Sequence, residues 1–445
     1  MIPRPLGAGV ILLLLGLQTA SPFDPMRGSL ARASAQSVYA DDPADPWNEL
    51  FFLLFTRSVP ARVVAPDTRP FNAGDERLRL SDRRVTRIEA GDRAIDPLYP
   101  SWQWMNGTAF DFSGERRWRI LEEPQLERLK TAIDAIHRTA ASRTPLALAL
   151  IQADLWAAYD MLSAASQPSG AGTGSFRPAI PRSREAAEAL PRIASAMRAL
   201  ALTDAEIARL PATYIDAVQS SRLPPIFDER SGWMEIRWSP RRTHDQAAGD
   251  RRATRVFVKP RQRPADVPTF LNRFRDGQGE DFGELESVAL VTEILLITTD
   301  GRVVRSPLTW EVQLRGAAAR IGGADVAQFE VSRRRLLTSP ASGGLVGVNA
   351  TDPVYMPMAG NDFSFATPPS LDGEPVVAPL ALRCAMCHTS RPGVGHIVTF
   401  STSKRRGPSA PPVNRLSPAE NLHAREVAAR KMKTPEFRAL LAQWR

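Results

Sequence analysis

Residues 287–315, SVALVTEILLITTDGRVVRSPLTWEVQLR, contain two apolar runs rich in β-branched residues, separated by Asp300–Gly301. An Asp-Gly pair between such runs is typical of a tight β-hairpin, because glycine readily adopts the left-handed conformation that the turn requires. Shorter alternating stretches lie on either side: WMEIRW, TRVFVK, AQFEVSRRRLL and GGLVGV. The sequence therefore predicts a mostly antiparallel, β-rich domain over residues 222–370, in which strands continue to about residue 350.

Residues 41–221 have helical periodicity instead. Asp45–Pro46 and Thr144–Pro145 are typical helix starts, and residues 203–206, TDAE, fit a capping box. The glycine-rich stretch 167–183 follows a helix and runs into prolines, so it lacks the strand-to-helix context of a phosphate-binding loop. We interpret it as a flexible linker within a helical domain. Together with the β-rich region, this predicts an α+β multidomain fold.

The chain has 445 residues, of which 43% are hydrophobic, and a formal net charge of +9. This length and composition suffice for about two or three ordinary cores. The arginines are scattered, which indicates a solvated surface with ion pairs and argues against a nucleic-acid groove. An acidic protein partner or peripheral association with an anionic membrane remains an alternative. Asp154 and Asp160 are better explained by ion pairs with arginine than by an acid–base pair, because about 120° of helix rotation separates them.

Residues 1–21, MIPRPLGAGVILLLLGLQTAS, predict a signal peptide. One early arginine precedes an apolar run that is short for a membrane span and typical of a secretory signal. An uncleaved anchor is the alternative. We expect a periplasmic or secreted protein of bacterial type.

Residues 382–390, LRCAMCHTS, contain the only two cysteines of the chain, Cys384 and Cys387, followed by His388. We therefore expect no disulfide elsewhere. Structural zinc needs four ligands, and the spacing of the remaining histidines fits no common zinc module. A redox dithiol needs a strand-to-helix turn in a βαβ fold, which the preceding proline-broken segment does not indicate. Cys-x-x-Cys-His is the signature of covalent haem attachment.

With this motif and two predicted terminal helices, residues 371–445 resemble a mono-haem c-type cytochrome. The resemblance implies a small α-helical module that holds one haem c. It also implies thioether bonds from Cys384 and Cys387 and makes His388 the proximal iron ligand. We recognise no family in residues 22–370.

The sixth iron ligand is predicted to be Met432, which lies between the two terminal helices. Alternatives are Met356, Met358, His396, His423 and an open coordination position. Met432 has a competing interpretation as an apolar residue that closes a helix end. Its neighbours Lys431 and Lys433 are expected at the haem edge, where their charge would attract an acidic redox partner.

The sequence thus predicts an exported electron carrier that exchanges one electron with a redox partner protein. One alternative is a haem sensor or enzyme with five-coordinate iron that binds a small molecule. Another is a secreted binding protein whose haem is structural. No convincing nucleophile–base pair lies in residues 41–370, so no catalytic residue is predicted.

Overall fold

The computed structural model describes residues 39–40, 42, 45–55, 62–63, 121, 123, 125–166, 184–220, 223–236, 251–275, 284–316, 326–348, 353–355, 376–379 and 422–444. All structural statements below concern these residues. The predicted signal peptide (1–21) and the linker (167–183) lie outside them, so both stay predictions.

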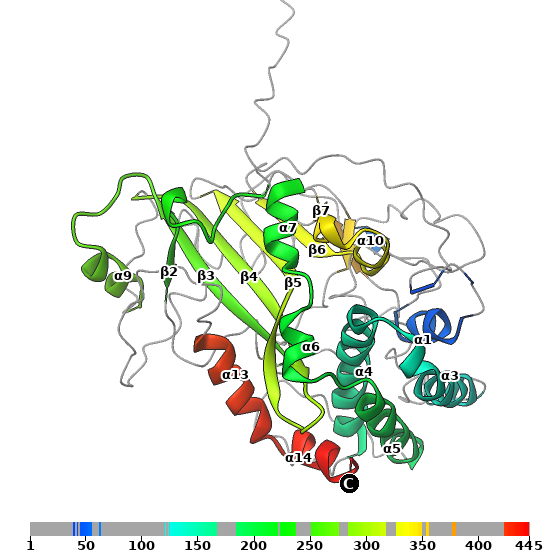
Figure 1. Cartoon of the computed structure of the whole chain (residues 1–445). Coiled ribbons are helices and arrows are strands. Elements are labelled where there is room, and N and C mark those ends of the chain that lie inside the picture. The colour runs from blue at the N-terminus through cyan, green and yellow to red at the C-terminus, as the bar shows by residue number, and fades with distance from the viewer. Residues whose placement is uncertain are drawn as a thin grey trace, which may run out of the picture.

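A six-stranded antiparallel sheet dominates the fold, with strand order β2-β3-β4-β5-β6-β7 (Figure 1). Its strands are β2 (Met234–Ile236), β3 (Arg252–Pro260), β4 (Leu285–Ile297), β5 (Val303–Gly316), β6 (Val326–Val331) and β7 (Leu345–Val348). Strands that are adjacent in the sheet are also consecutive in the sequence, so the sheet is a simple meander. The predicted antiparallel β region is confirmed.

The hairpin between β4 and β5 turns at Asp300–Gly301, as the sequence predicts. Gly301 has φ 83°, and its N–H donates to the carbonyl of Thr298 at 2.8 Å. Below the turn, Ile297 pairs with Val303. The turn therefore sets the register of the two longest strands.

Helices precede the sheet in the sequence and follow it. They are α1 (Pro46–Phe55), α3 (Gln125–Thr139), α4 (Pro145–Ser166), α5 (Arg184–Ala199), α6 (Asp204–Ala208) and α7 (Thr213–Ser220), then α13 (Leu422–Met432) and α14 (Pro435–Ala442). The predicted capping box is present, because the Thr203 side chain accepts from the Glu206 N–H and the Glu206 carboxylate accepts from the Thr203 N–H. The α+β class is confirmed.

Two short helices lie within the region predicted to be β-rich, α9 (Val267–Arg275) and α10 (Arg333–Thr338). The prediction of continuous β structure through AQFEVSRRRLL is wrong in its second half, since β6 ends at Val331. Ser332 is the reason, because its side chain accepts a hydrogen bond from the Arg335 N–H and starts a helix there.

A second, three-stranded sheet has the order β1-β9-β8 and contains β1 (Arg62–Val63), β8 (Pro353–Tyr355) and β9 (Val376–Pro379). β1 pairs with β9 in parallel and β8 pairs with β9 in antiparallel. The three strands come from the three regions that the sequence analysis separated. The region boundaries near residues 221 and 370 stay predictions.

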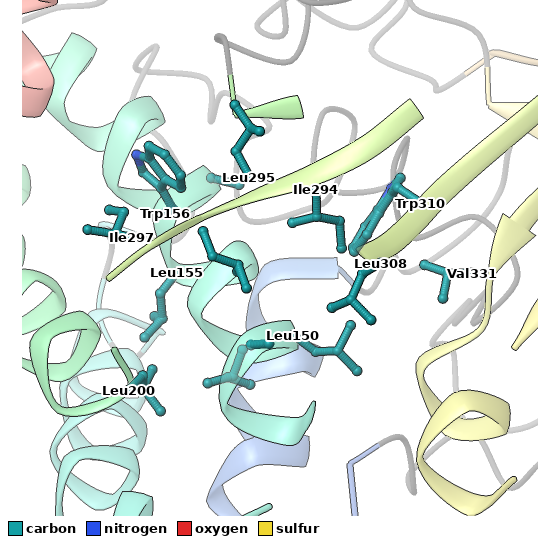
Figure 2. Packing of buried hydrophobic residues seen from close by; sticks show 14 of the residues in the cluster. Leu150, Leu155, Trp156, Leu200, Ile294, Leu295, Ile297, Leu308, Trp310 and Val331 are labelled. Carbon is teal, nitrogen blue, oxygen red and sulfur yellow. The ribbon is translucent and has the colours of Figure 1, made fainter. Parts of the chain in front are cut away.

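One connected hydrophobic cluster contains residues of the first helices, the sheet and the C-terminal helices. Figure 2 shows its centre, where Leu150, Leu155 and Trp156 of α4 lie among side chains of β4 and β5. Helix α4 therefore lies at the core, between the sheet and the other helices. A smaller cluster between β2, β3, β4 and α9 contains Ile236, Val256, Val258, Phe270, Leu271, Leu285 and Val288.

The C-terminal helices belong to the main cluster. α13 contacts β3, β4 and β5, and α14 contacts α4 and α5. The Phe437 ring lies 5.9 Å from the Trp156 ring, measured between centroids. The two C-terminal helices therefore pack into the same core as α4 and the six-stranded sheet. Among the described helices, none combines the length and apolarity needed to cross a membrane.

Candidate functional site

The predicted haem-attachment residues Cys384, Cys387 and His388 lie outside the described residues, as do Met356, Met358 and His396. The nearest described strand before the motif is β9, which ends at Pro379. Of the predicted iron ligands, the structure describes Met432 and His423, and both are on α13.

Met432 is the last residue of α13, and Thr434 starts the next helix by accepting a hydrogen bond from the Phe437 N–H. The Met432 side chain is 36% exposed, one of only two large hydrophobic side chains exposed to that degree in the described part of the chain. It does not close the helix end as a buried residue would. Its side chain is therefore partly accessible from outside α13.

His423 lies on the other side of the same helix. The two residues are nine positions apart, which at about 100° per residue places them half a turn apart. His423 is 9% exposed, and its Nδ1 lies 3.9 Å from Oε2 of Glu426. One face of α13 therefore cannot present both side chains, and Met432 is the more accessible donor.

Lys431 anchors the end of α13 to the interior. Its Nζ donates to Oδ2 of Asp160 at 2.6 Å and lies 5.5 Å from the centre of the Trp156 ring. Arg251 donates to the same carboxylate oxygen of Asp160 at 2.5 Å. Burial lowers the pKa of Lys431, and Asp160 opposes that effect only in part.

The predicted position of Lys431 at an exposed haem edge is therefore wrong. Lys431 is 3% exposed, whereas Lys433 is exposed as predicted. The reason is the partly buried Asp160 on α4, whose carboxylate holds the lysine in the interior. Only Lys433 of this pair is available at the surface near Met432.

A second buried charge cluster connects α4 with α10. Arg333 donates through Nε to Oδ2 of Asp154 at 2.9 Å and through Nη2 to Oδ1. The Tyr39 hydroxyl donates to the same carboxylate, and burial raises the pKa of Tyr39 well above its ordinary value. The predicted pairing of Asp154 and Asp160 with arginines is confirmed, with Arg333 and Arg251 as the partners.

A third cluster lies on the sheet around Arg255. The guanidinium donates to both carboxylate oxygens of Glu235, at 2.9 and 2.8 Å, and lies over the rings of Phe227 and Phe257. In the same way, Arg305 donates to both oxygens of Glu293. These bidentate pairs satisfy charges that are otherwise costly to bury.

The interpretation of the arginines as mainly solvated surface is thus wrong for Arg251, Arg255 and Arg333, all of which are buried. The sequence carries a signal for one of them. Within TRVFVK, Arg255 stands beside the apolar residues Val256 and Phe257, in a strand that is covered on both faces. A charged residue in such a strand needs a partner of opposite charge, which here is Glu235.

Comparisons with protein-family models, with curated proteins and with solved structures found no match. Within the described residues, no group of three or more His, Cys, Asp or Glu side chains is placed to hold a metal ion. The chemistry of the candidate site therefore rests on the sequence motif and on the accessible thioether of Met432.

Proposed function

We propose that this protein is an exported mono-haem c-type electron carrier. The observation that carries the proposal is the Cys384-Ala-Met-Cys387-His388 motif in a chain that has no other cysteine. Two thiols three residues apart suit the two vinyl groups of one porphyrin edge, and the next residue places an imidazole beneath the iron.

In this proposal Cys384 and Cys387 hold the haem covalently and His388 is the proximal ligand. The bound haem supplies one-electron chemistry through its iron. Met432 is the distal ligand, and its accessible thioether at the end of α13 supports this role. His423 is a poorer choice because its side chain is nearly buried.

The anchor around Lys431 has a role in the same proposal. Lys431 donates to Asp160, which also accepts from Arg251, so the adjacent Met432 is attached to a helix end that is tied to α4 and, through Asp160, to the residue before β3. A fixed ligand position lowers the reorganisation that accompanies a change of iron charge. The exposed Lys433 then provides positive charge near the ligand for an acidic redox partner.

The proposal is tested by expressing the full chain together with a cytochrome c maturation system. We expect a red protein whose haem survives acid–acetone extraction. Cys384→Ala and Cys387→Ala should each leave at most one thioether bond, and His388→Ala should abolish the low-spin spectrum. A colourless protein that retains one zinc ion per chain would contradict the proposal.

A further inference from the structure

Four buried or partly buried arginines of the described chain lie over aromatic rings: Arg143, Arg252, Arg255 and Arg333. Arg255 lies 4.8 Å from the Phe227 centroid and 4.9 Å from that of Phe257. Arg333 lies 4.7 Å from the Trp310 centroid. Arg252 lies over Trp310 too, at 4.3 Å. Stacking of this kind orients a guanidinium but does not neutralise its charge.

Arg143, Arg255 and Arg333 have carboxylate partners, whereas Arg252 has none among the described residues. Arg255 holds both oxygens of Glu235, and Arg333 holds both oxygens of Asp154. The Arg252 side chain makes no ion pair and no hydrogen bond with any described residue. Within the described part of the chain its guanidinium therefore keeps a full set of donors, and the residue is only partly covered.

The surroundings leave the Arg252 charge uncompensated. Burial and the nearby cations Arg251 and Arg333 lower the pKa of Arg252 to about 9, despite the attraction of Glu311 and Asp154. Glu311 lies beyond ion-pair distance and accepts a hydrogen bond from Gln313. Asp154 is already held by Arg333. An anion from outside the described residues would supply the missing partner.

We propose that Arg252, oriented by Trp310, binds the carboxylate group of a ligand. A planar guanidinium with free donors takes a carboxylate through two parallel hydrogen bonds, as Arg255 and Arg333 do within the chain. The carboxylate has two sources that share this chemistry. One is a free small organic acid, and the other is a propionate of the bound haem, which rests on the proposed function.

The first experiment tests the free acid. Purified full-length protein is heated in increasing succinate at constant ionic strength, with chloride as the compensating salt. Binding to the folded state raises Tm with the logarithm of succinate concentration above Kd. We expect this rise for the wild type and for the control Arg438→Gln, which removes an exposed arginine, and its loss in Arg252→Met.

The second experiment tests the propionate. If a haem propionate is bound to Arg252, succinate should leave Tm unchanged. Arg252→Met should then raise the pKa of the propionate and move the pH-dependent step of the reduction potential to higher pH. Arg438→Gln should leave that step in place. If the purified protein contains no haem, the proposed function is contradicted, but the succinate titration can still be performed on that protein.

A purely structural role for Arg252 would lower the Tm of Arg252→Met in ligand-free buffer. The proposal expects instead a Tm at least equal to that of the wild type, because a guanidinium without a carboxylate partner is costly to bury. Arg252→Lys provides a second variant that keeps the charge without the bidentate geometry, and it should bind succinate more weakly. The proposal is overturned if neither the succinate response nor the potential depends on Arg252.

Discussion

Lys431 of α13 and Asp160 of α4 form a buried hydrogen-bonded ion pair, with Nζ 2.6 Å from Oδ2. Arg251, at the start of β3, shares the same carboxylate oxygen. One acidic side chain thus connects three parts of the fold and holds the helix that ends at Met432. Two cations depend on one anion.

Replacing Asp160 should therefore be costly. Asp160→Asn leaves Lys431 and Arg251 buried together without a carboxylate, and we expect the free energy of unfolding to fall by about 3–5 kcal/mol. The measurement is urea denaturation. Asp134→Asn is the matched control, because its pair with Arg192 is exposed on both sides and should contribute about 0–1 kcal/mol. Equal losses in the two variants would contradict a buried anchor.

The lowered pKa of Lys431 predicts a pH dependence with a definite sign. Between the folded-state pKa and the ordinary value of 10.5, the unfolded chain binds a proton that the folded chain lacks. The free energy of unfolding contributed by Lys431 should therefore increase as pH rises through this window towards 10.5. Denaturation at several pH values should show this rise in the wild type and its absence in Lys431→Met. A fall in the wild type relative to the variant would mean that Asp160 raises this pKa.

Met432→Ala tests the distal ligand. Loss of the thioether should convert a low-spin haem into one with an open iron position that binds carbon monoxide when reduced. Absorption spectra before and after carbon monoxide addition measure the change, and Lys433→Ala, at the exposed neighbouring position, serves as the control. An unchanged spectrum would direct attention to Met356, Met358, His396 and His423. Rapid, complete carbon monoxide binding by the wild type would favour a sensor or enzyme over a carrier.

Two glycines with positive φ should respond differently to alanine. A Cβ at Gly343, with φ 69°, would meet the Thr213 carbonyl oxygen at 2.2 Å and the Ala217 nitrogen at 2.5 Å. A Cβ at Gly232, with φ 78°, would meet only the Lys259 side chain, at 4.0 Å. Gly232→Ala should cost about 1–2 kcal/mol from backbone conformation alone, and Gly343→Ala should cost clearly more. Thermal unfolding of the two variants compares them directly, and similar Tm values would refute the close packing of α7 on this loop.

Local signals predicted much of the fold. The hairpin at Asp300–Gly301 and the cap at Thr203 each depend on residues within a few positions of one another. A short stretch of sequence therefore includes all the residues that form each of these features. Ser332 shows the limit of such reasoning, because it follows a strand and starts a helix in a stretch whose alternation favours strand.

The buried charges could be predicted only in part. The helix rotation between Asp154 and Asp160 indicated arginine partners but not which ones, since Arg333 and Arg251 are distant in sequence. The interior position of Lys431 depends on Asp160 reaching it from α4, and nothing near Lys431 in the sequence signals that contact. Cys384, Cys387 and His388 were identified by spacing alone, and their role stays a prediction.

The last helix has a consequence for the timing of folding. Phe437, Leu440 and Trp444 fill the core beside α4 and α5, and Arg198 of α5 donates a hydrogen bond to the Trp444 carbonyl. A ribosome makes these residues after α4 and α5, so α4 and α5 keep an open apolar face until α14 has been synthesised. The core becomes complete only once α14 has left the ribosome, and until then a holding factor that covers apolar surface would have a site on those two helices.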